Sequence, residues 1–159
     1  MKEEKRKSPA VYVFLAFMAA LLIANICIRV AIPRVNLYEE GKDSLEAYPR
    51  AVYTLPEGTY EVLGSFGSEA GSASHIPFKT WERRYYCILV SDSAGQQYVM
   101  AARVQGRELQ ALEAGTAVEL KGLVSGLNEE RAKAMHDAAL NASAEIVDRC
   151  INDNGRGSM

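Results

Sequence analysis

The chain has 159 residues, of which 18 are basic and 20 acidic, and its formal net charge is −2. Beyond position 34 there are 12 basic and 18 acidic residues, a net charge of −6, and such a field repels polyanions, which argues against nucleic acid as a partner. Residues 35–159 suffice for one domain with a hydrophobic core and leave no room for two.

An apolar segment near the N-terminus dominates the sequence. From Ala10 to Ile28 no residue is charged, and Asn25 is the one strongly polar side chain. A helix of this length covers about 28 Å at about 1.5 Å per residue, which matches the hydrocarbon core of a bilayer. Pro33 has no amide hydrogen and ends the helix. We therefore predict a transmembrane helix over residues 9–33.

The segment is expected to be retained as an uncleaved signal anchor. Signal-peptide cleavage requires small residues after the apolar core, but Asn25 to Arg29 is bulky and charged. Ile26 precedes Cys27 where a bacterial lipoprotein signal has a small residue, so lipidation is disfavoured too. Cys27 then serves as a small apolar residue in the membrane.

The flanking charges predict the orientation of the anchor. Basic residues collect on the cytoplasmic side of a membrane span. Before the apolar segment lie Lys2, Lys5, Arg6 and Lys7, and after it lie Arg29, Arg34 and Lys42. We therefore expect a cytoplasmic tail over residues 1–8 and an extracytoplasmic C-terminal domain at the cell membrane. The opposite topology remains open, because the difference is small.

The first part of the domain is predicted from alternation and turn residues. Residues 34–50 are polar and acidic, with too few apolar side chains to form a buried face, and are interpreted as a membrane-proximal connector. Residues 51–55 and 59–66 alternate as two strands around a Pro-Glu-Gly turn. The small, polar stretch Gly67 to Pro77 is predicted to be a mobile loop.

The second part begins with the strongest strand pattern. Residues 78–90 and 96–104 predict a β-hairpin. Residues 106–115 predict a short helix that ends at a glycine. Residues 116–127 predict a strand with one solvent-exposed face. In that strand Gly122 falls on the inward face, which indicates a bend or a close backbone contact.

The chain then ends in a helix and a strand. Asn128 is expected to cap a helix whose first turn carries Glu129 and Glu130. A last strand is predicted over residues 144–151, within a domain of residues 51–153, and residues 154–159 form a flexible tail.

This element order resembles an OB-type fold over about Thr59 to Ile151. The resemblance rests on the short helix at residues 106–115, which lies where OB-type folds place a helix between their third and fourth strands. It implies a small β-rich α+β domain, an OB-like antiparallel barrel with one or two short helices. The helix before the last strand departs from the simplest pattern, so an α+β sandwich remains the alternative. Residues 118–138 (VELKGLVSGLNEERAKAMHDA) also resemble uncharacterised single-pass membrane proteins of Gram-positive gut bacteria.

The residues that could carry chemistry are few. His75 and His136 are the only histidines, and no cysteine or histidine spacing typical of a metal site is present. Ser72 and Ser74 precede His75, but no nucleophile-elbow sequence accompanies them. We therefore expect no catalytic, metal or cofactor site, and a protein that is not an enzyme.

Cys87 and Cys150 both fall in predicted strands. One hypothesis is a disulfide, which an oxidising compartment would permit if the strands adjoin. The other is a pair of buried free thiols.

An aromatic and basic cluster is the candidate binding surface. It consists of Trp81, Arg83, Arg84 and Tyr85, and OB-type barrels stack ligands on such side chains. The alternative is that the aromatic residues, with Tyr86 and Tyr98 as hairpin partners, fill a small core.

The functional hypothesis is a non-catalytic, single-pass protein anchored in the lipid bilayer by its N-terminal helix. It would present the β-rich domain to a protein partner in the membrane or envelope, or to an envelope ligand. The first alternative is a small-ligand receptor or enzyme with a pocket near residues 67–77. The weaker alternative is a nucleic-acid-binding barrel in the cytoplasm, with affinity that falls steeply with salt.

Overall fold

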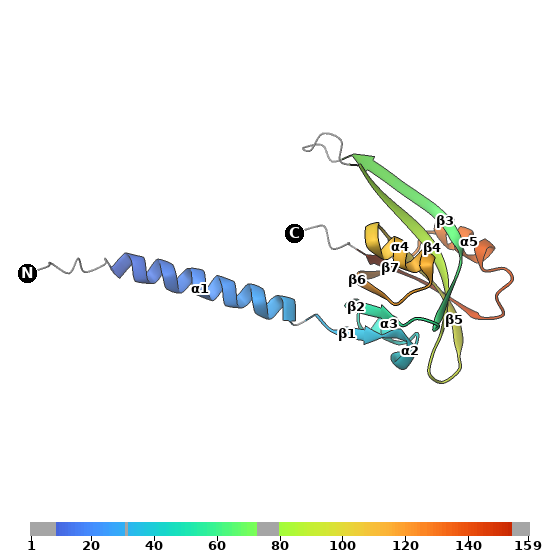
Figure 1. Cartoon of the computed structure of the whole chain (residues 1–159), viewed down its shortest axis with the longest axis horizontal. Helices are drawn as coiled ribbons and strands as arrows, with labels where there is room; N and C mark the ends of the chain where they lie inside the picture. Colours follow the sequence, from blue (N-terminus) through green and yellow to red (C-terminus); the bar gives the residue numbers. More distant parts are fainter. Residues whose placement is uncertain (1–8, 31, 73–79, 154–159) are drawn as a thin grey trace, which may run out of the picture. The chain divides into compact units, whose positions relative to one another are not determined.

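The computed structural model describes residues 9–30, 32–72 and 80–153. The chain forms two compact units, residues 1–32 and 33–159, which are described separately (Figure 1). The first unit contains helix α1, Pro9–Val30. Its stretch Pro9–Cys27 is long and apolar enough to cross a membrane, and none of it is buried within the protein. The predicted N-terminal apolar helix is therefore present.

The second unit is built on one seven-stranded sheet with the order β1-β2-β6-β7-β5-β4-β3. The strands are β1 (Arg34–Asn36), β2 (Arg50–Leu55), β3 (Tyr60–Ser72), β4 (Thr80–Ser91), β5 (Gln97–Val104), β6 (Val118–Gly126) and β7 (Glu145–Asp153). The helices are α2 (Leu37–Glu40), α3 (Ser44–Ala47), α4 (Gly106–Ala114) and α5 (Glu129–Ala138).

The sheet is mixed and open. The pairs β1–β2 and β5–β7 are parallel, and the other four neighbouring pairs are antiparallel. Strands β1 and β3 lie at its two edges, so among the described strands the sheet is not closed into a barrel. The β-rich α+β domain is confirmed, whereas a closed, purely antiparallel barrel is not what the structure shows.

The predicted hairpin is confirmed, and its strands are buried on both faces. Strands β4 and β5 pair from Ser91 with Gln97 onward. Tyr86, Ile88 and Val90 point into the main core, and the alternating Tyr85 and Cys87 join a second cluster on the opposite face. Burial on both sides explains the continuous apolar run in the sequence. Tyr86 and Tyr98 are both core residues, although they pair with Ala102 and Val90 rather than with each other.

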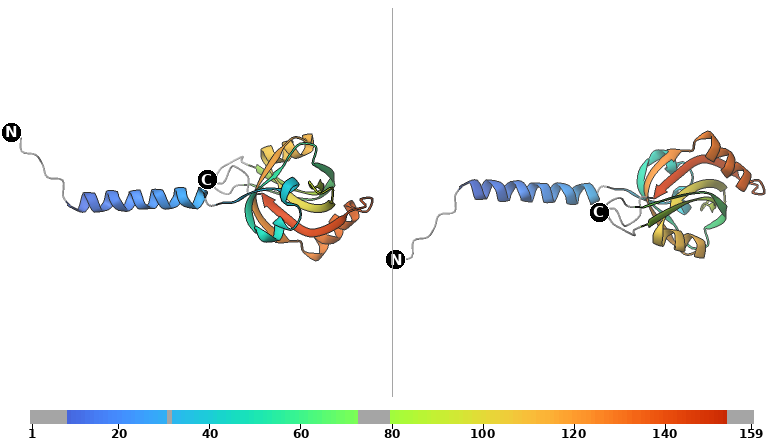
Figure 2. Two further views of the ribbon diagram at one scale, coloured as in Figure 1. Left: turned by 90° about the horizontal axis from the view of Figure 1, so that it is seen from below. Right: turned by 90° about the horizontal axis from the view of Figure 1, so that it is seen from above.

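Helices α4 and α5 cover opposite faces of the sheet (Figure 2). Helix α4 ends at Gly115, which has a left-handed conformation with φ 71°, as the sequence predicts. Helix α5 is capped by Asn128, whose side-chain oxygen accepts a hydrogen bond from the Arg131 amide at 2.9 Å. Leu112 of α4 packs in the main core, and Met135 of α5 packs in the second cluster.

The segment interpreted as a connector belongs to the folded domain. Residues 34–36 form β1, which pairs in parallel with β2, and residues 37–47 contain α2 and α3. Val35, Leu37 and Leu45 are fully buried in the main core. The interpretation was wrong because these three side chains have no helical or strand periodicity; they meet through pairing with residues distant in the sequence.

The predicted loop over residues 67–77 is also wrong in its first half. Strand β3 continues to Ser72 and pairs with β4 as far as Thr80. Small and polar residues favour loops locally, but the antiparallel neighbour satisfies their backbone groups and overrides that preference. Residues 73–77, including His75, lie outside the described residues.

Gly122 lies where β6 passes from one neighbouring strand to the other. Strand β6 pairs with β2 up to Leu123 and with β7 from Gly122 onward, so only these two residues of β6 have neighbours on both sides. A Cβ atom on Gly122 would lie 1.8 Å from the backbone oxygen of Asn152. The predicted close backbone contact is confirmed.

Candidate functional site

A row of polar side chains crosses the sheet face that carries α5. The register aligns Gly67 of β3, Tyr85 of β4, Arg103 of β5 and Asn152 of β7. Residues aligned in this way share a face of the sheet. Two residues farther along β3, Glu69 pairs with Arg83. This face is therefore polar at the end that α5 leaves uncovered.

Helix α5 positions the arginine that completes the site. Met135 and Ala139 are buried against Cys87, Ala101 and Cys150 of the sheet. This apolar contact fixes the helix on the sheet. Arg131, one helical turn before Met135, then reaches the polar row from the side.

Glu69 is the centre of the hydrogen-bond network. Its Oε1 atom accepts a hydrogen bond from the Tyr85 hydroxyl at 3.0 Å and one from Arg131 Nη2 at 2.6 Å. Its Oε2 atom lies 3.7 Å from Arg103 Nη1. The Arg131 guanidinium also stacks over the Tyr85 ring, 4.4 Å from its centroid. Phe66 packs against the same ring, with centroids 5.7 Å apart.

The electrostatics of the network follow from these contacts. The hydrogen bond from Tyr85 lowers the pKa of the Glu69 carboxyl, and the charges of Arg131 and Arg103 act in the same direction. Burial raises the pKa of the Tyr85 hydroxyl, which therefore stays protonated and donates. Glu69 is ionised at neutral pH and bound to its partners.

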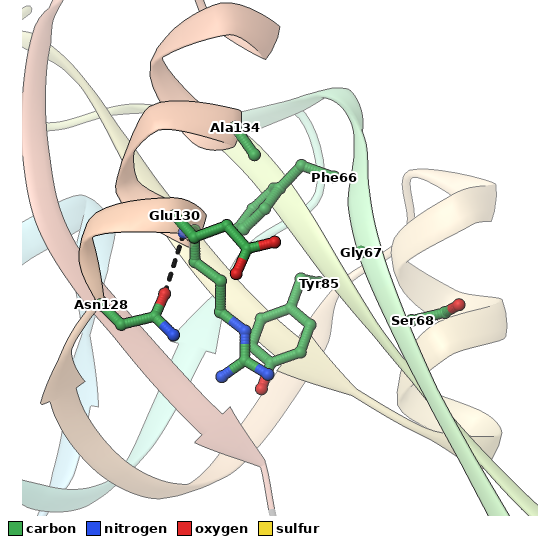
Figure 3. A pocket seen from close by; sticks show the side chains of 8 residues that line it. Phe66, Gly67, Ser68, Tyr85, Asn128, Glu130 and Ala134 are labelled. Atoms are coloured by element: carbon green, nitrogen blue, oxygen red, sulfur yellow. Dashed lines mark hydrogen bonds between the residues drawn. The ribbon is translucent and has the colours of Figure 1, made fainter.

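Above this network lies a small open pocket of about 200 Å³. It lies between β3, β4 and the N-terminal turn of α5 (Figure 3). The residues that line it are Phe66, Gly67, Ser68, Tyr85, Asn128, Glu130, Arg131 and Ala134. Aromatic side chains in the wall of the pocket thus adjoin a cation, an amide and the Glu130 carboxylate, a combination that suits directed hydrogen bonds to a partner.

Glu69 is expected to stabilise the domain in a pH-dependent way. Its pKa in the folded state is lower than the ordinary value of 4.5, so its contribution is complete above that pH and is lost as the pH falls through the lowered value. Glu69→Gln should therefore reduce the free energy of unfolding by about 1 kcal/mol at pH 7, and this difference should vanish in strong acid. Urea unfolding of both proteins from pH 7 to pH 3 measures it.

The control for this experiment is Glu61→Gln on the same strand. Glu61 is exposed at the other end of β3, so its substitution should change the free energy of unfolding by about 0.5 kcal/mol or less. A Glu69→Gln effect of equal size at pH 7 and pH 3 would contradict the assigned network.

The structure divides the residues of the predicted binding surface. Tyr85 lies in the pocket wall, and Arg83 on the same face donates from Nε to Gln105 Oε1 at 3.1 Å. Arg84 points to the other face, where it pairs with Glu82 at 2.6 Å and Glu113 at 3.3 Å. Trp81 of β4 pairs with Gly71 of β3, and its side chain lies outside the described part. Alternation along β4 separates the two arginines.

Cys87 and Cys150 are free thiols, so the hypothesised disulfide is not formed. Both are aligned with Ala101, on either side of β5. Two strand spacings separate their Cα atoms by about 10 Å, beyond the reach of a disulfide, about 4.4–6.8 Å. Burial raises the pKa of Cys87 to about 11 and that of Cys150 to about 12, so neither is a reactive thiolate near neutral pH.

The second histidine lies away from the pocket network. His136 Nε2 is 2.8 Å from Asp148 Oδ1, and both side chains are largely exposed. Among the residues that the structure describes, no group of three or more His, Cys, Asp or Glu side chains is arranged to hold a metal ion.

Sequence reasoning missed three members of the network. Glu69 fell within the predicted loop, and Arg103 and Arg131 were not selected. Their signal was weak: Arg103 aligns with Tyr85 only once the hairpin register is known, and Arg131 reaches Glu69 only after α5 docks.

Comparison with known proteins does not extend this picture, because no family model, no curated protein and no solved structure matches the chain.

Proposed function

We propose that this chain is a single-pass membrane protein without catalytic activity, whose extracytoplasmic, OB-like domain binds a protein or envelope ligand. The observation that carries this proposal is the partly exposed Arg131 guanidinium, which lines the pocket over the buried Tyr85 ring and pairs with the Glu69 carboxylate. Such a cation holds a partner by charge-assisted hydrogen bonds.

The anchor is supported by the length and composition of α1. Its apolar side chains are exposed over the stretch Pro9–Cys27, and a helix that is hydrophobic all round is stable in lipid. The excess of basic residues before it, from Lys2 to Lys7, supports a cytoplasmic N-terminus. With one span, the domain then lies on the extracytoplasmic side.

The OB-like character is supported by the order of the strands. Strands β3, β4 and β5 form a three-stranded meander, α4 follows it, and β6 and β7 return beside it. Strand β2 leads into β3 through four residues and pairs with β6. One chain segment therefore borders both ends of the curled sheet, which suits the partly open barrel of OB-type folds.

The size of the pocket favours a binding module over an enzyme or a receptor that encloses a small molecule. Sites that enclose small ligands have volumes of about 300–1,000 Å³, whereas this open pocket has about 200 Å³. It accommodates one side chain or one ring of a larger partner. The alternative of a small-ligand receptor or enzyme expects a pocket near residues 67–77. Gly67 and Ser68, at the start of that segment, line this pocket, which favours the alternative.

Substitution of the pocket arginine tests the proposal. In native membranes, crosslinking followed by pull-down of Arg131→Ala should recover about tenfold less of the partner that the wild-type chain recovers, since a charge-assisted contact contributes about 1.5–3 kcal/mol. The matched control is Lys133→Ala, an exposed residue of the same helix, which should recover the wild-type amount.

Two outcomes would contradict the proposal. Equal recovery by the two variants would remove the pocket from the binding surface. A small molecule that co-purifies with the wild-type chain and is lost from Arg131→Ala, with no change in any protein partner, would favour the receptor alternative.

A further inference from the structure

The end of the sheet where the chain enters β1 carries a distinct set of exposed side chains. Strand β1 runs parallel to β2 with Arg34 beside Val52, and the Val52 amide donates to the Pro33 oxygen at 2.9 Å. Because the strands are parallel, the chain that precedes Arg34 comes from the side of β2 on which Arg50 lies.

The register across β6 gathers three cations at this end. Val52 pairs with Lys121, and Arg50 pairs with Leu123. Arg34, Arg50, Lys121 and Leu123 therefore lie in adjacent rows on the outer face of the sheet. The Arg34 side chain is 73% exposed and forms an exposed ion pair with Glu119 at 3.3 Å. Glu119 pairs with Thr54, two residues along β2 from Val52.

An exposed hydrophobic residue accompanies the cations, because Leu123 is 51% exposed. Together, Arg34, Arg50, Lys121 and Leu123 form what we call the strand-end surface. Long basic side chains reach the boundary between lipid and water while their stems stay in apolar surroundings.

A short stretch of chain connects Arg34 of this surface to the end of α1. Helix α1 ends at Val30 and β1 begins at Arg34, with three residues between them. Four Cα steps reach at most about 14 Å. If α1 spans a bilayer, the headgroup layer, about 5–8 Å thick on each side, lies within this reach.

We propose that the strand-end surface binds the anionic headgroups of the membrane in which α1 is anchored. This inference rests on the anchor of the proposed function. The domain has a net charge of −6 beyond position 34, so most orientations bring acidic side chains toward an anionic surface and are repelled. The strand-end surface presents Arg50 and Lys121, together with Arg34 in its ion pair with Glu119; it attracts phosphate groups and inserts Leu123. It thereby orients the domain.

Depth-sensitive labelling of the full chain in vesicles tests this inference. A fluorophore is attached at Leu123→Cys or, as the control, at Leu140→Cys, which is 77% exposed after α5. Cys27→Ala removes the exposed native thiol, and Cys87 and Cys150 are buried. The expected result is quenching by nitroxide-labelled lipid at position 123 and little at position 140, in vesicles containing phosphatidylglycerol.

The charge contribution is tested in the same system. Arg50→Gln combined with Lys121→Gln should abolish the difference between phosphatidylglycerol vesicles and pure phosphatidylcholine vesicles at position 123. The inference is overturned if position 123 is quenched no more than position 140 while the protein stays with the vesicles after a carbonate wash. Release of the protein by carbonate would instead overturn the anchor itself.

Discussion

Gly122→Ala is expected to prevent stable folding of the β-rich domain. The added methyl carbon would lie 1.8 Å from the Asn152 backbone oxygen and 2.5 Å from its carbonyl carbon. Backbone atoms of a central strand cannot rotate away from a clash as a side chain can. Strands β6 and β7 would therefore have to separate at Gly122. We expect a loss of more than about 4 kcal/mol, against a total stability of about 5–15 kcal/mol for a domain.

Gly126→Ala is the matched control in the same strand. A Cβ atom there would meet only the end of the Arg149 side chain, at 3.7 Å, which is ordinary contact. Its effect should stay within about 1 kcal/mol. Urea unfolding followed by circular dichroism compares the two variants, and equal stability of both would disprove the assigned pairing of β6 with β7.

Leu45→Ala is expected to destabilise the domain by about 2–5 kcal/mol, the usual range for a buried leucine in a core. Leu45 is only 1% exposed and packs with Val35 and Leu37 in the main core. The substitution removes apolar contacts and leaves a cavity. The midpoint of urea unfolding should fall while the slope of the transition stays unchanged.

Tyr48→Ala is the control for this segment. Tyr48 is 38% exposed, and its contact with Tyr53 is made by its backbone oxygen, which alanine retains. We expect a change of about 1 kcal/mol or less. If Leu45→Ala were equally mild, residues 34–50 would be a connector, as their composition first indicated.

Sequence patterns correctly predicted the secondary-structure elements that are determined by residues close together in the sequence. The alternation of residues 116–127, the glycine after α4 and the capping residue Asn128 each act within a few neighbouring residues. They were therefore readable without knowledge of the fold. The hairpin of β4 and β5 was predicted for the same reason, since its register depends on the short turn between the strands.

Elements that depend on distant partners were missed. Strand β1 exists because it pairs with β2, and residues 67–72 are a strand because β4 lies beside them. Neither partnership leaves a periodic signal in the segment itself. The same reason explains which site residues were predicted and which were missed. Tyr85 and Arg83 belong to a strand that the sequence shows clearly, whereas Glu69 and Arg131 come together only in the folded domain.

The proposed location and partners of the protein depend on the membrane anchor. Alkaline carbonate extraction of membranes that contain the full chain tests this anchor most directly. An integral helix over Pro9–Cys27 predicts that the protein remains in the membrane pellet with its N-terminal segment intact. Recovery of the protein in the supernatant, or of a mature chain that begins after Ile32, would contradict it.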